Sequence, residues 1–164
     1  MSATPDAAMS SARKLSRFSP EAPVISAADR GTVLAFDFGE KRIGVAAGEL
    51  ETGLAHTLPG ICGERSDARF AAIARLLAEW RPACLVVGLP LATDGSGHAM
   101  TLRARRFARQ MEGRYRLPVV MVDERYSSVE AESRVRAEPG AGGHGIDSGA
   151  AQLILQQYLE ERGR

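Results

Sequence analysis

Residues 33–47 read VLAFDFGEKRIGVAA, and this stretch decides how the chain folds. Its first four residues are all apolar, which is typical of a strand covered on both faces. Asp37 follows directly, where a carboxylate is costly unless a cation or hydrogen bonds compensate its charge. Residues 38–42 supply a polar turn with a glycine, and a second apolar run follows. We therefore predict a β-hairpin with an acid near the end of its first strand, although that acid would also suit a simple turn cap.

Downstream, short continuous apolar runs alternate with segments whose apolar residues recur at helical spacing. This pattern predicts alternating strands and helices. Pro59 suits an edge strand, and Ser66 suits the cap of the helix that follows. The expected elements are strands at 54–62, 83–89 and 117–122, and helices at 66–80, 99–113, from Ser127 and from Asp147. This order predicts an α/β fold with a mixed five-stranded sheet, three strands antiparallel and two parallel, flanked by helices. The first strand would lie at the centre.

The chain of 164 residues should form one domain at 31–164, preceded by a Ser-, Ala- and Pro-rich tail at 1–30 that we expect to be disordered. The formal charge of +1 neither favours nor excludes nucleic acid. No apolar run approaches the roughly 20 residues that a membrane span needs, and the N-terminus lacks the apolar region of a secretory signal. Cys62 and Cys84 lack the spacing of metal ligands. They indicate buried thiols in a reducing cytoplasm.

Positive charge gathers on the helix expected at 99–113. Four arginines share the face opposite its apolar side chains, and Glu112 is the only acid in this stretch of sequence. Like charges at helical spacing repel, and a polyanion would remove that penalty. We interpret this face as a nucleic-acid-binding surface, the alternative being a solvated face. The residues assigned to nucleic-acid binding are Lys41, Arg42, Arg103, Arg106, Arg109 and Arg125.

Three acids should meet at one edge of the sheet. Asp37 lies near the end of the central strand, and Glu124 ends a parallel strand at the same edge. Asp147 begins the last helix, whose first turn can reach this edge, although it would also serve as an N-cap alone. Side chains alternate along a strand, so only one of Asp123 and Glu124 can face the site, and that choice stays open here. Converging carboxylates repel unless a metal neutralises them, and hard oxygen ligands select Mg²⁺ or Mn²⁺. Two metals about 4 Å apart could activate a water and stabilise the leaving oxygen of a phosphodiester.

Four motifs carry a resemblance to a known family: LAFDFGEKRIGVA, VVGLP followed by DGS, VDERYSS and IDSGAAQLILQ. In this order and spacing they resemble the YqgF/RuvX family of pre-16S ribosomal RNA nucleases, also described as Holliday junction resolvase-like proteins. The resemblance covers residues 31–161. It implies an RNase H-like fold, a cytoplasmic bacterial protein, and metal-dependent cleavage of structured RNA or branched DNA. By motif match, the catalytic and metal-binding acids are Asp37, Glu124 and Asp147, with Asp123 as the neighbouring alternative.

The sequence departs from the family's pattern in two places. Ala92 stands where the family usually has Asn, and the loop before Asp147 is rich in glycine where relatives usually carry lysines. Neither departure removes a candidate metal ligand. The preferred hypothesis is an endonuclease that processes the 5′ end of pre-16S rRNA, with Holliday junction resolution by a homodimer as an alternative. Two other hypotheses are a non-catalytic nucleic-acid-binding factor and a nucleotide-binding protein. DFGEKRIGVA also resembles the phosphate-binding hairpin of actin-like ATPases, which need two such domains.

Overall fold

The computed structural model describes residues 30–91, 97–124 and 145–162, with backbone only for 145–147. It contains a single five-stranded sheet in the order β3-β2-β1-β4-β5. Its strands are β1 (Thr32–Phe38), β2 (Arg42–Glu49), β3 (Leu54–Cys62), β4 (Cys84–Leu89) and β5 (Val119–Asp123). The helices are α2 (Ser66–Trp80), α3 (Ala99–Tyr115) and α5 (Gly145–Arg162).

The mixed topology predicted from the sequence is confirmed. β1 lies at the centre of the sheet and pairs antiparallel with β2 and parallel with β4. β3 extends the antiparallel side, and β5 extends the parallel side. The carboxyl ends of β1, β4 and β5 therefore meet at one edge of the sheet, which is where ligands bind in α/β folds.

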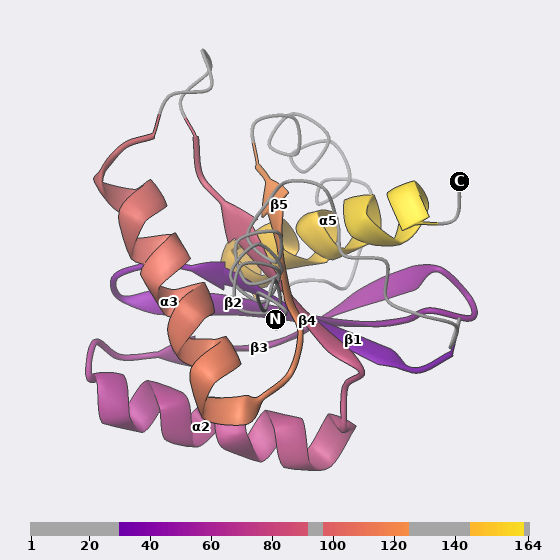
Figure 1. Ribbon diagram of the computed structural model, residues 1–164, viewed down its shortest axis with the longest axis horizontal. Helices are drawn as coiled ribbons and strands as arrows, with labels where there is room; N and C mark the ends of the chain where they lie inside the picture. The colour runs from indigo at the N-terminus through magenta and orange to yellow at the C-terminus, as the bar shows by residue number, and fades with distance from the viewer. Residues whose placement is uncertain (1–29, 92–96, 125–144, 163–164) are drawn as a thin grey trace, which may run out of the picture.

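Helices cover both faces of the sheet, with α2 and α3 on one face and α5 on the other (Figure 1). In β1, Leu34 and Phe36 pack in the core shared with α2 and α3, whereas Val33 and Ala35 pack in the core shared with α5. All four side chains are fully buried. The unbroken apolar run of this strand is thus explained, because alternate residues fill two separate cores.

β3 is an edge strand, as Pro59 predicted. Two glutamines of α5 bind polar backbone groups of this strand and of the turn before it. Gln152 donates a hydrogen bond to the carbonyl oxygen of Ala55 (3.1 Å). Gln156 accepts one from the N–H of Ala55 (3.2 Å) and donates one to the carbonyl oxygen of Gly53 (2.9 Å). These bonds fix α5 across the sheet, in addition to the apolar contacts beneath it.

Two helix starts differ from the prediction. α2 begins at Ser66 itself, after Arg65, and the Arg65 side chain makes no capping hydrogen bond. α5 begins at Gly145, so Asp147 lies inside its first turn rather than ahead of it. The predicted tail up to residue 29 and the helix from Ser127 lie outside the described residues. Within the described ranges, no helix is long and apolar enough to cross a membrane.

Candidate active site

Asp37 and Glu124 lie at the edge where the parallel strands end. Asp37 is the penultimate residue of β1, and Glu124 follows the last residue of β5. The N–H of Glu124 donates a hydrogen bond to the carbonyl oxygen of Leu89 (3.1 Å), so the sheet continues through this residue. The parallel order of β1, β4 and β5 brings the two acids to the same edge.

The alternation of side chains decides which of two neighbouring acids belongs to this site. Val122 faces the core under α5, and Met121 faces the core under α2 and α3. Continuing the alternation, Glu124 falls on the α5 face and Asp123 on the other. Asp37 is also on the α5 face, because it lies two residues after Ala35. The structure therefore pairs Asp37 with Glu124, the choice that the sequence left open.

The two carboxyl groups share a proton. Burial raises the pKa of Glu124 to about 8, and the negative charge of Asp37, a hydrogen bond to Asp37 and the charge of Asp123 act in the same direction. Both Asp37 and Glu124 are partly buried. Two negative charges are unfavourable in this desolvated position, so the raised pKa favours a proton held between the two carboxyl groups.

Glycines occupy two strand positions beside this pair. Gly44 lies opposite Asp37 in β2, and Gly88 lies one residue beyond the last register pair between β1 and β4. A methyl group at Gly88 would overlap the Oε1 atom of Glu124 and would lie 2.6 Å from Cδ1 of Ile154. Glu124 therefore reaches toward Asp37 across a strand position that only a glycine leaves open.

The first turns of α5 approach the same edge. Ser148 is fully buried, and its Oγ donates a hydrogen bond to the carbonyl oxygen of Leu58 (2.7 Å). Leu58 pairs with Val45, the residue after Gly44, at the end of β2 that lies beside Asp37. The backbone of Asp147, which precedes Ser148, is therefore carried to this end of the sheet. Its side chain is outside the described part, so the meeting of three carboxylates stays a prediction.

The donors at this site fit a hard divalent cation. Asp37 and Glu124 supply carboxylate oxygens on one face of the sheet, and their mutual repulsion is what a bound cation would relieve. Among the side chains that the structure describes, no group of three or more His, Cys, Asp or Glu residues could hold a metal ion. The pair therefore needs a third ligand, and Asp147 is the predicted one.

With this geometry established, comparisons with known proteins identify the family. A family model described as "RuvX: Holliday junction resolvase" matches residues 31–161. The chain belongs to the RuvX family. This confirms the resemblance seen in the four sequence motifs.

Relatives of this RuvX chain are similar over most of its length. One from Burkholderia mallei (strain SAVP1) is 54% identical over 129 residues, which is 79% of this chain and 88% of the relative. One from Methylobacillus flagellatus is 52% identical over 142 residues, which is 84% of this chain and 97% of the relative. Both are named "Putative pre-16S rRNA nuclease".

A solved structure has the same fold with little sequence similarity. The fowlpox virus resolvase, solved in complex with Holliday junction DNA, is 8% identical and gives a TM-score of 0.51. The match covers 81% of this chain and 99% of the resolvase. The RNase H-like fold expected from the resemblance is thereby confirmed for this RuvX chain.

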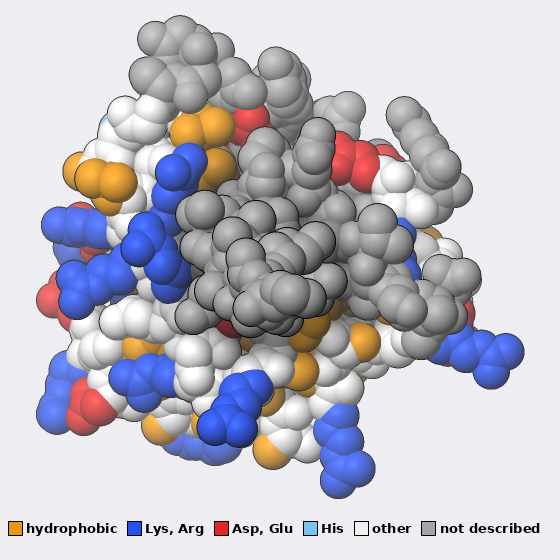
Figure 2. Space-filling view, viewed as in Figure 1, with side chains coloured by type: hydrophobic (Ala, Val, Ile, Leu, Met, Phe, Trp, Pro, Cys, Tyr) orange, Lys and Arg blue, Asp and Glu red, His pale blue; other side chains and the backbone are white. Residues whose placement is uncertain are grey.

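The arginine face of this RuvX chain is exposed as predicted. We define the α3 arginine face as Arg103, Arg105, Arg106 and Arg109, all of which are exposed. Figure 2 shows Lys and Arg side chains gathered over the part of the surface where α3 lies in Figure 1. Of the other residues assigned to nucleic-acid binding, Lys41 and Arg42 are exposed at the end of the β1–β2 turn, and Arg125 lies outside the described residues.

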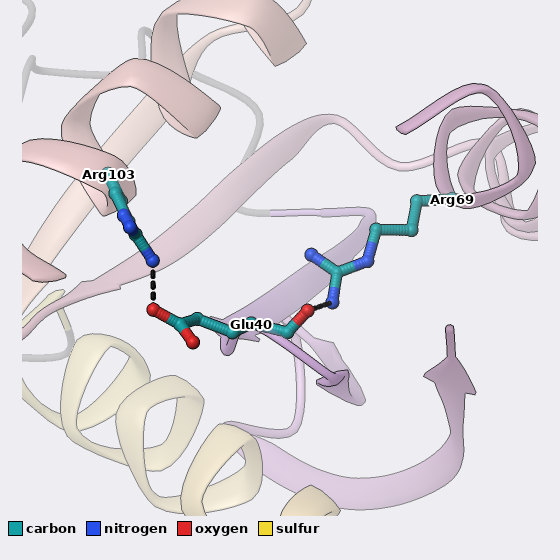
Figure 3. Close-up of polar contacts among 3 residues, drawn as sticks. All are labelled: Glu40, Arg69 and Arg103. Atoms are coloured by element: carbon teal, nitrogen blue, oxygen red, sulfur yellow. Dashed lines mark hydrogen bonds and ion pairs between the residues drawn. The ribbon is translucent and has the colours of Figure 1, made fainter. Parts of the chain in front are cut away.

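Sequence reasoning missed Arg69 of α2, which is only 7% exposed. Its Nε donates a hydrogen bond to the carbonyl oxygen of Gly63 (2.6 Å), and its NH2 group donates one to the carbonyl oxygen of Glu40 (Figure 3). The guanidinium also lies over the ring of Phe38, 5.5 Å from its centroid. The sequence could have indicated that Arg69 is buried, because it lies four residues before Ile73 and therefore on the apolar face of α2.

Proposed function

We propose that this RuvX chain is a metal-dependent endonuclease that hydrolyses phosphodiester bonds in structured nucleic acid. Its proposed substrate is the 5′ end of pre-16S rRNA, and its proposed location is the cytoplasm. The observation that carries the proposal is the placement of Asp37 and Glu124 side by side on one face of the sheet, at the edge where parallel strands end. Relatives that are more than half identical and carry the name of such a nuclease support the choice of substrate.

In this proposal Asp37 and Glu124, with Asp147 from α5, hold Mg²⁺ or Mn²⁺. When bound, the metal supplies positive charge that activates a water and stabilises the leaving oxygen of the phosphodiester. Both carboxyl groups would have to be ionised to hold the metal, so the proton between Asp37 and Glu124 would be released to solvent. The exposed arginines of α3, with Lys41 and Arg42, hold the phosphate backbone and carry no sequence information.

A second candidate substrate is a four-way DNA junction. The description of the matching family model supports it, since that description names a Holliday junction resolvase. The same acids would act on either nucleic acid. A homodimer would suit the junction, because two strands of a symmetric junction must be cut.

The test compares both substrates side by side. Purified wild type and Asp37→Asn are incubated with a pre-16S rRNA 5′ leader or a four-way DNA junction, with Mn²⁺ or with EDTA. We expect wild type to cut the RNA only with Mn²⁺, and Asp37→Asn to lose cleavage while keeping its circular dichroism spectrum and its RNA affinity. Glu79→Gln, an exposed acid of α2, is the matched control and should cut normally. Equal cleavage by Asp37→Asn would refute the assignment, and cleavage of the junction alone would favour the second candidate.

A further inference from the structure

The turn between β1 and β2 is held by two helices at a single residue. The carboxylate of Glu40 forms an ion pair with Arg103 of α3. Its backbone carbonyl accepts a hydrogen bond from Arg69 of α2, and the two contacts point in opposite directions (Figure 3). The N–H of Gly63 also donates to the carbonyl oxygen of Lys41 (2.9 Å). The turn therefore has a fixed shape that does not depend on the Glu40 side chain.

The two contacts of Glu40 differ in how easily they can be exchanged. Arg69 is buried and binds backbone carbonyls, so it belongs to the folded framework. The side chains of Glu40 and Arg103 are 60% and 54% exposed. An exposed ion pair adds little to stability, because water and salt screen it. The Glu40 carboxylate can therefore leave Arg103 without disturbing the fold.

Arg103 stands where the α3 arginine face meets the end of β1. It lies one helical turn before Phe107, whose ring lies 5.0 Å, between centroids, from the ring of Phe38. Phe38 directly follows Asp37 in β1. Glu40, the partner of Arg103, lies three residues after Asp37, so a phosphate backbone bound along the arginine face and extending to the edge that holds Asp37 would pass close to the Arg103–Glu40 pair.

We propose that Glu40 is an internal counterion that occupies, on Arg103, the position of a substrate phosphate, and that nucleic acid displaces it on binding. Carboxylate and phosphate are both recognised by the guanidinium group through charge-assisted hydrogen bonds, so one can replace the other. Glu40 then lowers affinity for any polyanion, and binding depends on a phosphate placed to take over Arg103. The inference rests on the proposed function, because it assigns a specificity-determining residue to that site.

The experiment measures binding without cleavage. A fluorescent pre-16S rRNA 5′ leader is titrated in EDTA, at several salt concentrations, with wild type, Glu40→Gln, Arg103→Gln and the double variant. We expect Glu40→Gln to bind about three- to fivefold more tightly at low salt, and its plot of log affinity against log salt to be steeper by about 0.7 to 0.9. In wild type the displaced Glu40 carboxylate takes up a cation from solution, which offsets one of the counterions that the phosphates release, and Glu40→Gln removes this offset. Arg103→Gln should weaken binding, and Glu40→Gln should have little effect in that background.

The control removes the same charge elsewhere. Glu51→Gln changes an exposed acid in the turn after β2, at the opposite end of the sheet from Asp37, and should leave affinity near wild type. An equal gain in Glu51→Gln, or unchanged binding in Glu40→Gln, would overturn the proposal. The proposal would also be overturned if Glu40→Gln raised RNA affinity by the same factor in the Arg103→Gln background as in wild type. The outcome is separate from the nuclease proposal, because a chain that binds as expected but cuts neither nucleic acid would refute only the latter.

Discussion

The proton shared by Asp37 and Glu124 should make folding less favourable as pH rises. The pKa of Glu124 is raised from 4.5 to about 8 in the folded chain, mainly by burial and then by Asp37. Between these two values the folded chain binds about one proton more than the unfolded chain. The free energy of unfolding should therefore fall by about 1.4 kcal/mol per pH unit. This contribution is present in full below about pH 4.5 and is lost as pH passes about 8.

Urea unfolding in EDTA at half-unit steps from pH 5 to 9 would measure this dependence. Glu124→Gln keeps a hydrogen-bond donor but cannot ionise, so it should lose this part of the slope. At pH 8 it should exceed wild type by on the order of 4 kcal/mol, because it no longer carries the cost of ionising a buried acid beside Asp37. The control Glu79→Gln, in an exposed position on α2, should keep the wild-type slope. If wild type and Glu124→Gln show the same pH dependence, the shared proton does not exist.

Three further predictions concern the same edge of the sheet. Gly88→Ala should push Glu124 away from Asp37 and cost about 1–3 kcal/mol through overpacking, and urea unfolding would detect the lost pH slope; a normal slope would contradict the close approach. Ser148→Ala should cost about 1–2 kcal/mol, because the carbonyl of Leu58 loses a buried hydrogen bond, and an unchanged urea midpoint would argue against that bond. Mn²⁺ affinity, measured by calorimetry, should increase with pH up to about 8, because the metal competes with the shared proton; constant affinity from pH 6 to 8 would exclude this competition.

The central part of the fold was predictable because burial on both faces leaves a clear pattern. The apolar run 33–36 predicts a strand covered on both faces, and the structure places it at the centre of the sheet. The choice between Asp123 and Glu124 was not predictable for the same reason. Residues 119–122 are apolar on both faces, so no alternation in the sequence tells which face a following acid will share with Asp37.

The contacts of the β1–β2 turn were missed because they leave almost no trace in the sequence. Arg69 binds backbone carbonyls, which any residue supplies. Glu40 and Arg103 are 63 residues apart, and nothing local links them. The burial of Thr101 in α3 was also missed, because a threonine does not contribute to an apolar pattern. The Thr101 side chain is buried because its hydroxyl donates a hydrogen bond to the carbonyl oxygen of Pro90.

The position of α5 has a consequence for the newly made protein. This helix follows all five strands in the chain, yet it supplies the cover for one whole face of the sheet and the proposed third acid, Asp147. During translation the sheet can pair before α5 emerges, but Val33, Ala35 and their neighbours then face water. A nascent chain at that stage exposes apolar surface that favours aggregation, and in the proposed mechanism it cannot cleave RNA. If Asp147 is the third acid, the order of synthesis keeps the chain from cleaving RNA until α5 has packed against the sheet.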